Sequence, residues 1–223
     1  MKTKKKTKLT CLAACAVVAL AVGTVACTSD GGPPTDGAKN ATVVTACENG
    51  TYTWSDVDER DVLTAVSPKQ RLAAGGGLLT HELKRLHTPR TAVTSEKGPR
   101  VDAEAALRSL GVRIGDTDAI ETEDYAFADV HRPAQHLEKN STSVDGGGTF
   151  VGYAWVRQVT ADFQYACGNG ERTVGRAISW TTDGSGVLEC SENLVDADPG
   201  DPAPMAAGLS CGPDAPAAGT ARS

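Results

Sequence analysis

The chain has 223 residues, of which 22 are Lys or Arg, 28 are Asp or Glu and 4% are aromatic. The formal net charge of −6 argues against a nucleic-acid-binding protein, because phosphate contacts require clustered Lys and Arg. The few aromatic residues require a core built from Val, Leu, Ile and Ala, and the length suits one domain of ordinary size.

Residues 1–26 have the layout of an export signal. They begin with MKTKKKTKLT, which contains five lysines and no acid, and continue with the apolar run CLAACAVVALAVGTVA. The run is shorter than the roughly 20 apolar residues of a permanent span, so it predicts a signal peptide. An ordinary secretory cut near 19–21 and an uncleaved anchor are the alternatives. Without residues 1–26, the 17 remaining basic and 28 acidic side chains give a formal charge of −11.

The small residues 23–26 directly before Cys27 resemble the lipobox of bacterial lipoproteins. The Ala-, Gly-, Asp- and Thr-rich composition is also similar to that of actinobacterial lipoproteins. The resemblance implies that the Cys27 thiol receives a diacylglycerol and that acyl chains such as palmitate hold the protein at the outer face of the cell membrane. It implies no activity, and residues 41–223 resemble no known family.

The first part of the mature chain combines a tether with short predicted elements. Residues 27–40 have the polar, Gly- and Pro-rich composition of a flexible tether. Alternation of aromatic and polar residues predicts a strand over 51–57, and a second short apolar run covers 61–66. Leucines at helical spacing predict a short helix over 78–87 that ends before Pro89.

The middle of the chain contains the clearest helical pattern. Residues 101–111 have Asp102 as an N-cap and Gly111 at the position of a C-terminal cap. A strand is expected over 125–130, and residues 131–148 have the composition of a long loop.

Residues 149–190 predict an antiparallel meander. A period of two runs through 149–167, glycines and an asparagine follow as a turn, and 171–182 returns as a second strand. Asp183-Gly184-Ser185-Gly186 predicts another turn into 187–190. The expected fold is mainly β, a single antiparallel domain over 41–194 built as a sandwich- or barrel-like meander with one or two short helices; an α+β domain is the alternative. The Pro-, Ala- and Gly-rich residues 195–223 predict a disordered tail.

Four cysteines besides Cys27 follow the signal, and an even number in an exported chain predicts disulfides. We favour Cys47–Cys167, which ties the start of the domain to its longest strand, and Cys190–Cys211, which fastens the tail. Two other pairings stay open. A zinc site is the alternative use of these thiols, but no cysteine or histidine pair has ligand spacing, so we expect no metal and no cofactor.

Several short patterns invite a catalytic or binding interpretation. Asp183-Gly184-Ser185-Gly186 has a different residue order from the serine motif of trypsin-like proteases. The glycine runs 75–77 and 146–148 lack the Lys-Ser or Lys-Thr of a P-loop. The histidines lack the spacing of a helical metal site, and an acidic run lacks EF-hand spacing. These residues are His81, His87, His131 and His136, and Asp116, Asp118, Glu121, Glu123 and Asp124.

Two surface hypotheses remain. One locally basic patch on the acidic chain is a candidate contact for an acidic partner. Four strand aromatics would stack on sugar rings if they faced outward, but their alternation with aliphatic neighbours predicts core positions. These residues are Lys84, Arg85, Arg90, Lys97 and Arg100, and Tyr52, Trp54, Trp155 and Trp180.

The expected function is a lipid-anchored binding or interaction module of the cell envelope, without catalytic activity. Its partners would be the membrane, through Cys27, and an envelope protein or wall polymer. An envelope hydrolase with a non-standard site is the alternative, and a small solute-binding protein is the third. A hydrolase predicts converging groups in one cleft, such as His131 or His136 beside an acid and a serine.

Overall fold

The computed structural model describes residues 45–116, 126–137, 139–194, 197–198 and 200–219. The expected fold class is confirmed: the protein is mainly β, its sheets are antiparallel, and the residues that the structure describes include two short α-helices. The larger sheet is open rather than closed into a barrel, with the strand order β4-β1-β7-β8-β5, and β2 pairs with β7 outside this path. Strands β3 and β6 form a second, two-stranded sheet. Cys27 and most of the acidic run at 116–124 lie outside the described residues.

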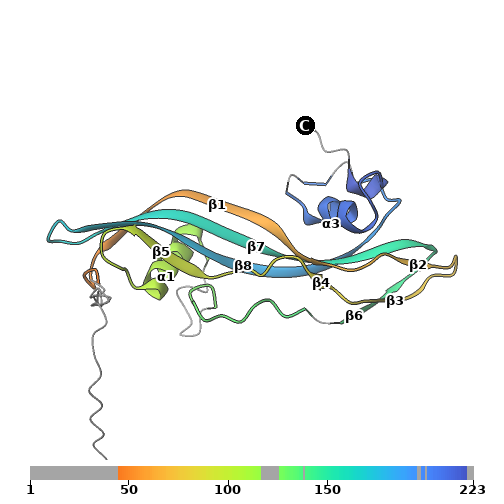
Figure 1. Ribbon diagram of the computed structural model, residues 1–223, viewed down its shortest axis with the longest axis horizontal. Helices are drawn as coiled ribbons and strands as arrows, with labels where there is room; N and C mark the ends of the chain where they lie inside the picture. The colour runs from red at the N-terminus through yellow and green to blue at the C-terminus, as the bar shows by residue number, and fades with distance from the viewer. Residues whose placement is uncertain (1–44, 117–125, 138, 195–196, 199, 220–223) are drawn as a thin grey trace, which may run out of the picture. The chain divides into compact units, whose positions relative to one another are not determined.

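Three long strands form the centre of the larger sheet and run side by side in Figure 1. The short strands lie beside them or in the second sheet. The strands are β1 (Thr51–Val66), β2 (Gln70–Leu72), β3 (Gly77–His81), β4 (Lys84–Arg85), β5 (Ala92–Lys97), β6 (Asn140–Val144), β7 (Gly148–Ala166) and β8 (Arg172–Glu189). The two short runs expected at 51–57 and 61–66 are therefore one strand, which stays paired with β7 across an irregularity between Ser55 and Asp58.

The buried side of β7 changes half-way along the strand. From Val159 to Tyr165 the odd-numbered residues are buried, as the alternation predicts. From Phe150 to Gln158 the even-numbered residues are buried, while Tyr153 and Trp155 stay half-exposed. Because successive side chains of a strand point to opposite faces, the two halves of β7 bury mainly opposite faces. A single inward face for the whole strand is therefore wrong.

Strand β8 continues through the predicted turn at Asp183–Gly186. Gly184 and Gly186 lie directly opposite Trp155 and Tyr153 of β7. A Cβ atom at Gly184 would lie 2.7 Å from the Trp155 ring, and one at Gly186 would lie 2.6 Å from the Tyr153 ring. The rings of β7 therefore pack on the two glycines of the neighbouring strand, an arrangement that stabilises glycine in a sheet. The glycines do not form a turn.

Helix α1 (Ala103–Ile114) confirms the clearest helical pattern and extends it by three residues. The Asp102 carboxylate accepts a hydrogen bond from the Ala105 amide at 2.7 Å, as an N-cap does. The left-handed C-cap is Gly115, with φ 81°, rather than Gly111. Leu107 and Leu110 of α1 pack with Val159 of β7, so α1 covers that half of the sheet.

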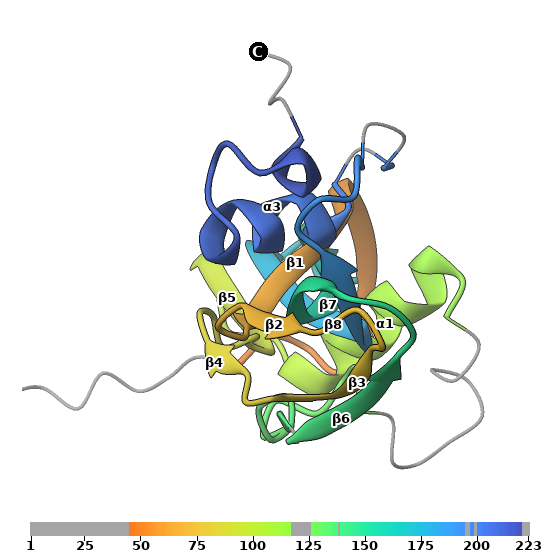
Figure 2. The same ribbon diagram turned by 90° about the vertical axis from the view of Figure 1, so that its right-hand side faces the viewer.

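Three expected elements between residues 78 and 148 differ in the structure. Residues 78–87 form β3 and β4 instead of a helix, and 140–144 form β6 inside the expected long loop. Residues 126–130 contain turns instead of a strand. The helical leucine spacing is misleading here because its leucines share no buried face: Leu79 is buried in β3, whereas Leu86 is exposed. Figure 2 shows β3 and β6 paired side by side.

The expected tail contains folded structure. Helix α3 (Pro202–Ser210) and the short 3-10 helix η1 (Pro216–Ala218) follow β8. Ala206, Ala207 and Ala217 are fully buried and pack against Leu63 and Val151 of the sheet. Alanines carry too little apolar surface to stand out in the sequence, but they allow a helix to approach a sheet closely. The folded part of the chain therefore extends beyond residue 194.

Both favoured disulfides are present. Cys47 and Cys167 join with Cα atoms 6.0 Å apart, and Cys190 and Cys211 with Cα atoms 5.6 Å apart. Disulfides persist in oxidising compartments, so they indicate an extracytoplasmic protein. Among the described residues, no helix is both long and apolar enough to cross a membrane.

Candidate functional site

An open groove lies where two helices leave the sheet uncovered. On the odd-numbered side of β7, Val151 packs under α3 and Val159 packs under α1. Between them, Tyr153, Trp155 and Arg157 line a cavity of about 480 Å³. Residues of β1 and the segment that enters α3 form its other walls. We call this cavity the α3 groove.

The aromatic floor of the α3 groove follows from the strand register. Tyr153 and Trp155 are two residues apart, so their side chains leave β7 on the same face. The Cβ position of Gly184 lies 2.7–2.8 Å from three atoms of the Trp155 ring, and that of Gly186 lies 2.6–2.8 Å from two ring atoms and the hydroxyl oxygen of Tyr153, so both side chains lie against β8. The rings are half-exposed. The sequence expectation that Trp155 lies in the core is therefore wrong, whereas Trp180 is buried as expected.

Charged side chains surround this floor. The Arg157 guanidinium donates two hydrogen bonds, of 2.9 and 3.0 Å, to the Asp61 carboxylate. These hydrogen bonds, and next the charge of Asp61, raise the pKa of Arg157. Burial, followed by the charge of Asp201, raises the pKa of Tyr153 further above its ordinary value, and its phenol is a hydrogen-bond donor at neutral pH, as that of any tyrosine is. Asp201 also caps α3, accepting from the Ala203 amide at 2.8 Å.

A second cavity, of about 340 Å³, brings His136 together with Asp183 and Ser185. Asp183 and Ser185 leave β8 on the face opposite Trp155, because they pair with Val156 and Ala154. All three side chains are exposed, and in the described part of the chain no hydrogen bond joins any two of them. A serine nucleophile needs a base within hydrogen-bond reach, so the cavity contains the residue types of a catalytic triad without its connections.

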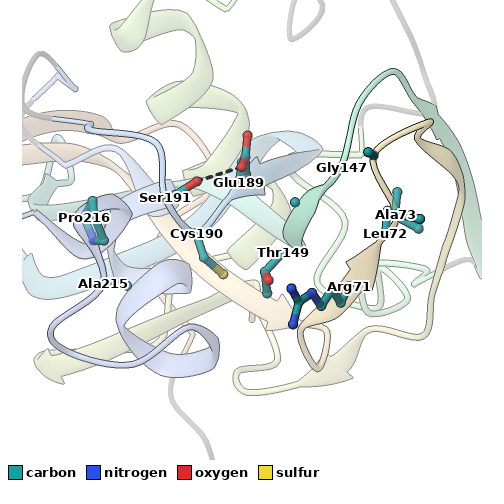
Figure 3. A pocket seen from close by; sticks show the side chains of 12 residues that line it. Arg71, Leu72, Ala73, Gly147, Thr149, Glu189, Cys190, Ser191, Ala215 and Pro216 are labelled. Carbon is teal, nitrogen blue, oxygen red and sulfur yellow. Dashed lines mark hydrogen bonds between the residues drawn. The ribbon is translucent and has the colours of Figure 1, made fainter.

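A third cavity, of about 700 Å³, lies beside the Cys190–Cys211 disulfide. Figure 3 shows Arg71 and Thr149 on one side of it and Glu189 with Ser191 on the other. The Ser191 hydroxyl donates to the Glu189 carboxylate at 2.7 Å. Most of the remaining lining is alanine, glycine and proline, so few side chains there can define a ligand.

The structure divides the basic patch into two groups. Lys84 and Arg85 pair with the last residues of β1, whereas Arg100 forms a bridge with Thr45, just before β1. The 16 residues of β1 span roughly 50 Å at about 3.3 Å per residue. The Arg85 guanidinium also donates to the Gln135 carbonyl at 2.6 Å. The five residues therefore do not form one contact surface.

The other predicted residues have structural surroundings. His81 is buried, with its ring against Gly152, while His87 and His131 are exposed. Tyr52 and Trp54 stack with ring centroids 5.6 Å apart and pack against Phe163. In the described part of the chain, no three His, Cys, Asp or Glu side chains gather as a metal site.

Comparison of the chain with protein-family models, with curated proteins and with solved structures finds no match. Sequence reasoning misses the α3 groove because its walls come from three distant segments, and the composition of the segment before α3 predicts a tail. The available signal is that Tyr153 and Trp155 in one strand have the same two-residue spacing as Gly184 and Gly186 in the next segment.

Proposed function

We propose that this protein is an extracytoplasmic, lipid-anchored binding protein that takes its ligand in the α3 groove. The observation that carries the proposal is the floor of Tyr153 and Trp155, two aromatic rings left half-exposed between α1 and α3. Half-exposed aromatic side chains with polar groups around them are typical of binding sites.

The geometry supports binding more than catalysis. Three polar groups of the α3 groove are already fixed, since Asp61 holds Arg157 and Asp201 caps α3. Fixed groups reduce the entropy lost on binding a ligand. No serine, cysteine, threonine or histidine lines this groove among the described residues, so it lacks the usual nucleophiles and the usual base.

The site is tested by a defined probe set: an organic cation, a neutral oligosaccharide and an organic anion, each titrated into the detergent-solubilised protein. We expect one class of probe to shift the indole N–H signal of Trp155 in NMR spectra, and Trp155→Leu to abolish that binding. Trp54→Phe is the control, because Trp54 lies in the other aromatic cluster. If no probe disturbs Trp155, the assignment of the groove as a ligand site is wrong.

The lipid anchor has its own test. Cys27→Ala removes the thiol that would receive the diacylglycerol, so we expect loss of acyl labelling and release of the protein from membranes. Cys11→Ala, inside the proposed signal, is the matched control and should change neither. Membrane retention of the Cys27→Ala protein would contradict the anchor.

A hydrolase is the second candidate, favoured by the shared cavity of His136, Asp183 and Ser185. Catalysis would require His136 to move within hydrogen-bond reach of the Ser185 hydroxyl, since apo active sites can tighten when substrate binds. A fluorophosphonate probe should then label Ser185 and fail on Ser185→Ala and His136→Gln proteins. Absence of labelling at Ser185 would remove this candidate.

A further inference from the structure

We infer that the α3 groove binds an organic cation, a quaternary or protonated ammonium group held over Trp155 and Tyr153 and faced by carboxylates. This inference names the ligand class of the groove and rests on the proposed function. It follows from the net negative charge of the groove lining and from the chemistry of the rings that form its floor.

The charge balance of the groove is negative. Four lining residues are acidic, Glu59, Asp61, Asp198 and Asp201, against the two cations Arg60 and Arg157. Asp61 and Arg157 compensate each other at 2.9 Å, and Arg60 lies 3.7 Å from Asp58, outside the groove lining.

The other three carboxylates, those of Glu59, Asp198 and Asp201, form no ion pair with any described residue. An anionic ligand would meet this repulsion directly, whereas a cation would relieve it. The acidic composition of the chain also favours the approach of cations.

The rings supply the second part of the site. The face of an aromatic ring attracts a cation through its quadrupole, and tryptophan is the strongest of the three aromatic residues in this respect. One face of the Trp155 ring is covered by Gly184, and the side chain borders the groove.

The same fold uses this interaction internally. The Arg132 guanidinium carbon lies 3.2 Å from the ring centroid of Trp180, and Trp180 is buried. Trp155 instead borders the groove that Asp201 also lines, so a ligand can take the place that Arg132 has on Trp180.

Neutral sugars are the competing ligand class, because they also stack on flat rings. A sugar site requires hydrogen-bonding partners but gains little from uncompensated negative charge. The Tyr153 phenol and the carboxylates of Glu59, Asp198 and Asp201 could hydrogen-bond a sugar, but only a cation also gains from the net negative charge of the lining. The observed set of groups therefore suits a cation better than a sugar.

The decisive comparison uses choline and its uncharged isostere 3,3-dimethyl-1-butanol, titrated into the full chain in non-ionic detergent and followed by the Trp155 and Tyr153 signals. The two probes have the same shape and differ by one charge. We expect choline to bind at least about fivefold more tightly than the isostere, and this ratio to fall as the salt concentration rises.

Two variants separate charge from shape. Asp201→Asn keeps the N-cap of α3, because asparagine caps as well as aspartate, and removes one negative charge. It should weaken choline binding about threefold and leave isostere binding unchanged. Asp102→Asn, the same change at the N-cap of α1, is the matched control and should leave both unchanged. Amide spectra report whether each variant stays folded.

Each outcome decides between the claims. Preference for choline that depends on Trp155 and Asp201 supports the inference. Equal binding of both probes, or preference for a neutral oligosaccharide at Trp155, overturns the cation while keeping the groove as a ligand site. No change at Trp155 or Tyr153 with any probe overturns both the inference and the proposed function.

Discussion

Gly175 shows how closely β7 and β8 pack. It lies opposite Phe163, and a Cβ atom there would lie 2.6 Å from the Phe163 ring and would overlap the carbonyl oxygen of Thr94. Backbone on the neighbouring strand cannot rotate away as a side chain can. We expect Gly175→Ala to lower the free energy of unfolding by about 1–3 kcal/mol, measured by urea denaturation.

Gly168→Ala is the matched control for this change. A Cβ atom at Gly168, in the turn after β7, would meet nothing within 4 Å, and its backbone lies outside the left-handed region. We expect Gly168→Ala to leave stability within about 0.5 kcal/mol of the wild type. Equal effects of the two substitutions would contradict the packing of Phe163 on Gly175.

His81 makes stability depend on pH. Burial lowers the pKa of this imidazole, and its Nδ1 atom has no hydrogen-bond partner among the described residues. Below about pH 6.5, the ordinary pKa, the unfolded chain binds this proton more readily than the folded chain, so acid favours unfolding. We expect His81→Phe to flatten the loss of stability from about pH 6.5 downward, whereas His87→Phe, at an exposed position, should not. An unchanged pH profile in the His81→Phe protein would contradict this.

At the scale of elements, α3 is a structural helix rather than part of a tail. Ala206 is fully buried against the sheet, whereas its neighbour Met205 is 61% exposed. Ala206→Asp would bury a carboxylate without a partner, so we expect a loss of about 3 kcal/mol or more. Met205→Asp introduces the same residue into the same helix and should change stability by about 0.5 kcal/mol. Thermal unfolding compares the two, and similar melting temperatures would show that α3 does not pack on the sheet.

The element-scale predictions from sequence succeed where the pattern is local. The helix after Asp102 forms because its cap and its apolar face are both encoded within 12 residues. The predicted helix at 78–87 fails because its leucine spacing also fits two short strands. Whether this segment forms a helix or strands depends on the pairing of β3 with β6, which lies more than 50 residues away. No local sequence pattern contains that information.

At the scale of the whole molecule, the two disulfides should contribute unequally. Cys47–Cys167 closes a loop of 120 residues and Cys190–Cys211 one of 21. In the chain-entropy description, the longer loop stabilises by about 5 kcal/mol and the shorter by about 3 kcal/mol. We expect the Cys47→Ala/Cys167→Ala pair to lower unfolding stability more than the Cys190→Ala/Cys211→Ala pair, measured by denaturation without reductant. The reverse order would mean that local packing around α3 outweighs loop closure.

The sequence by itself determined the features that short stretches encode: the export signal pattern, the mainly β class, the capped helix after Asp102, and a cysteine set that allowed the observed pairing. For the α3 groove, the sequence shows only separate components, namely aromatic residues in a strand and a glycine-rich segment, and does not show that they lie together. The tertiary structure decided that Gly184 and Gly186 accept the rings of Trp155 and Tyr153, and that alanines of α3 close one end of the sheet. The physical reason is strand register. A glycine is equally compatible with a turn and with a strand position that an aromatic ring covers, and the residue opposite it in the neighbouring strand decides which of the two forms.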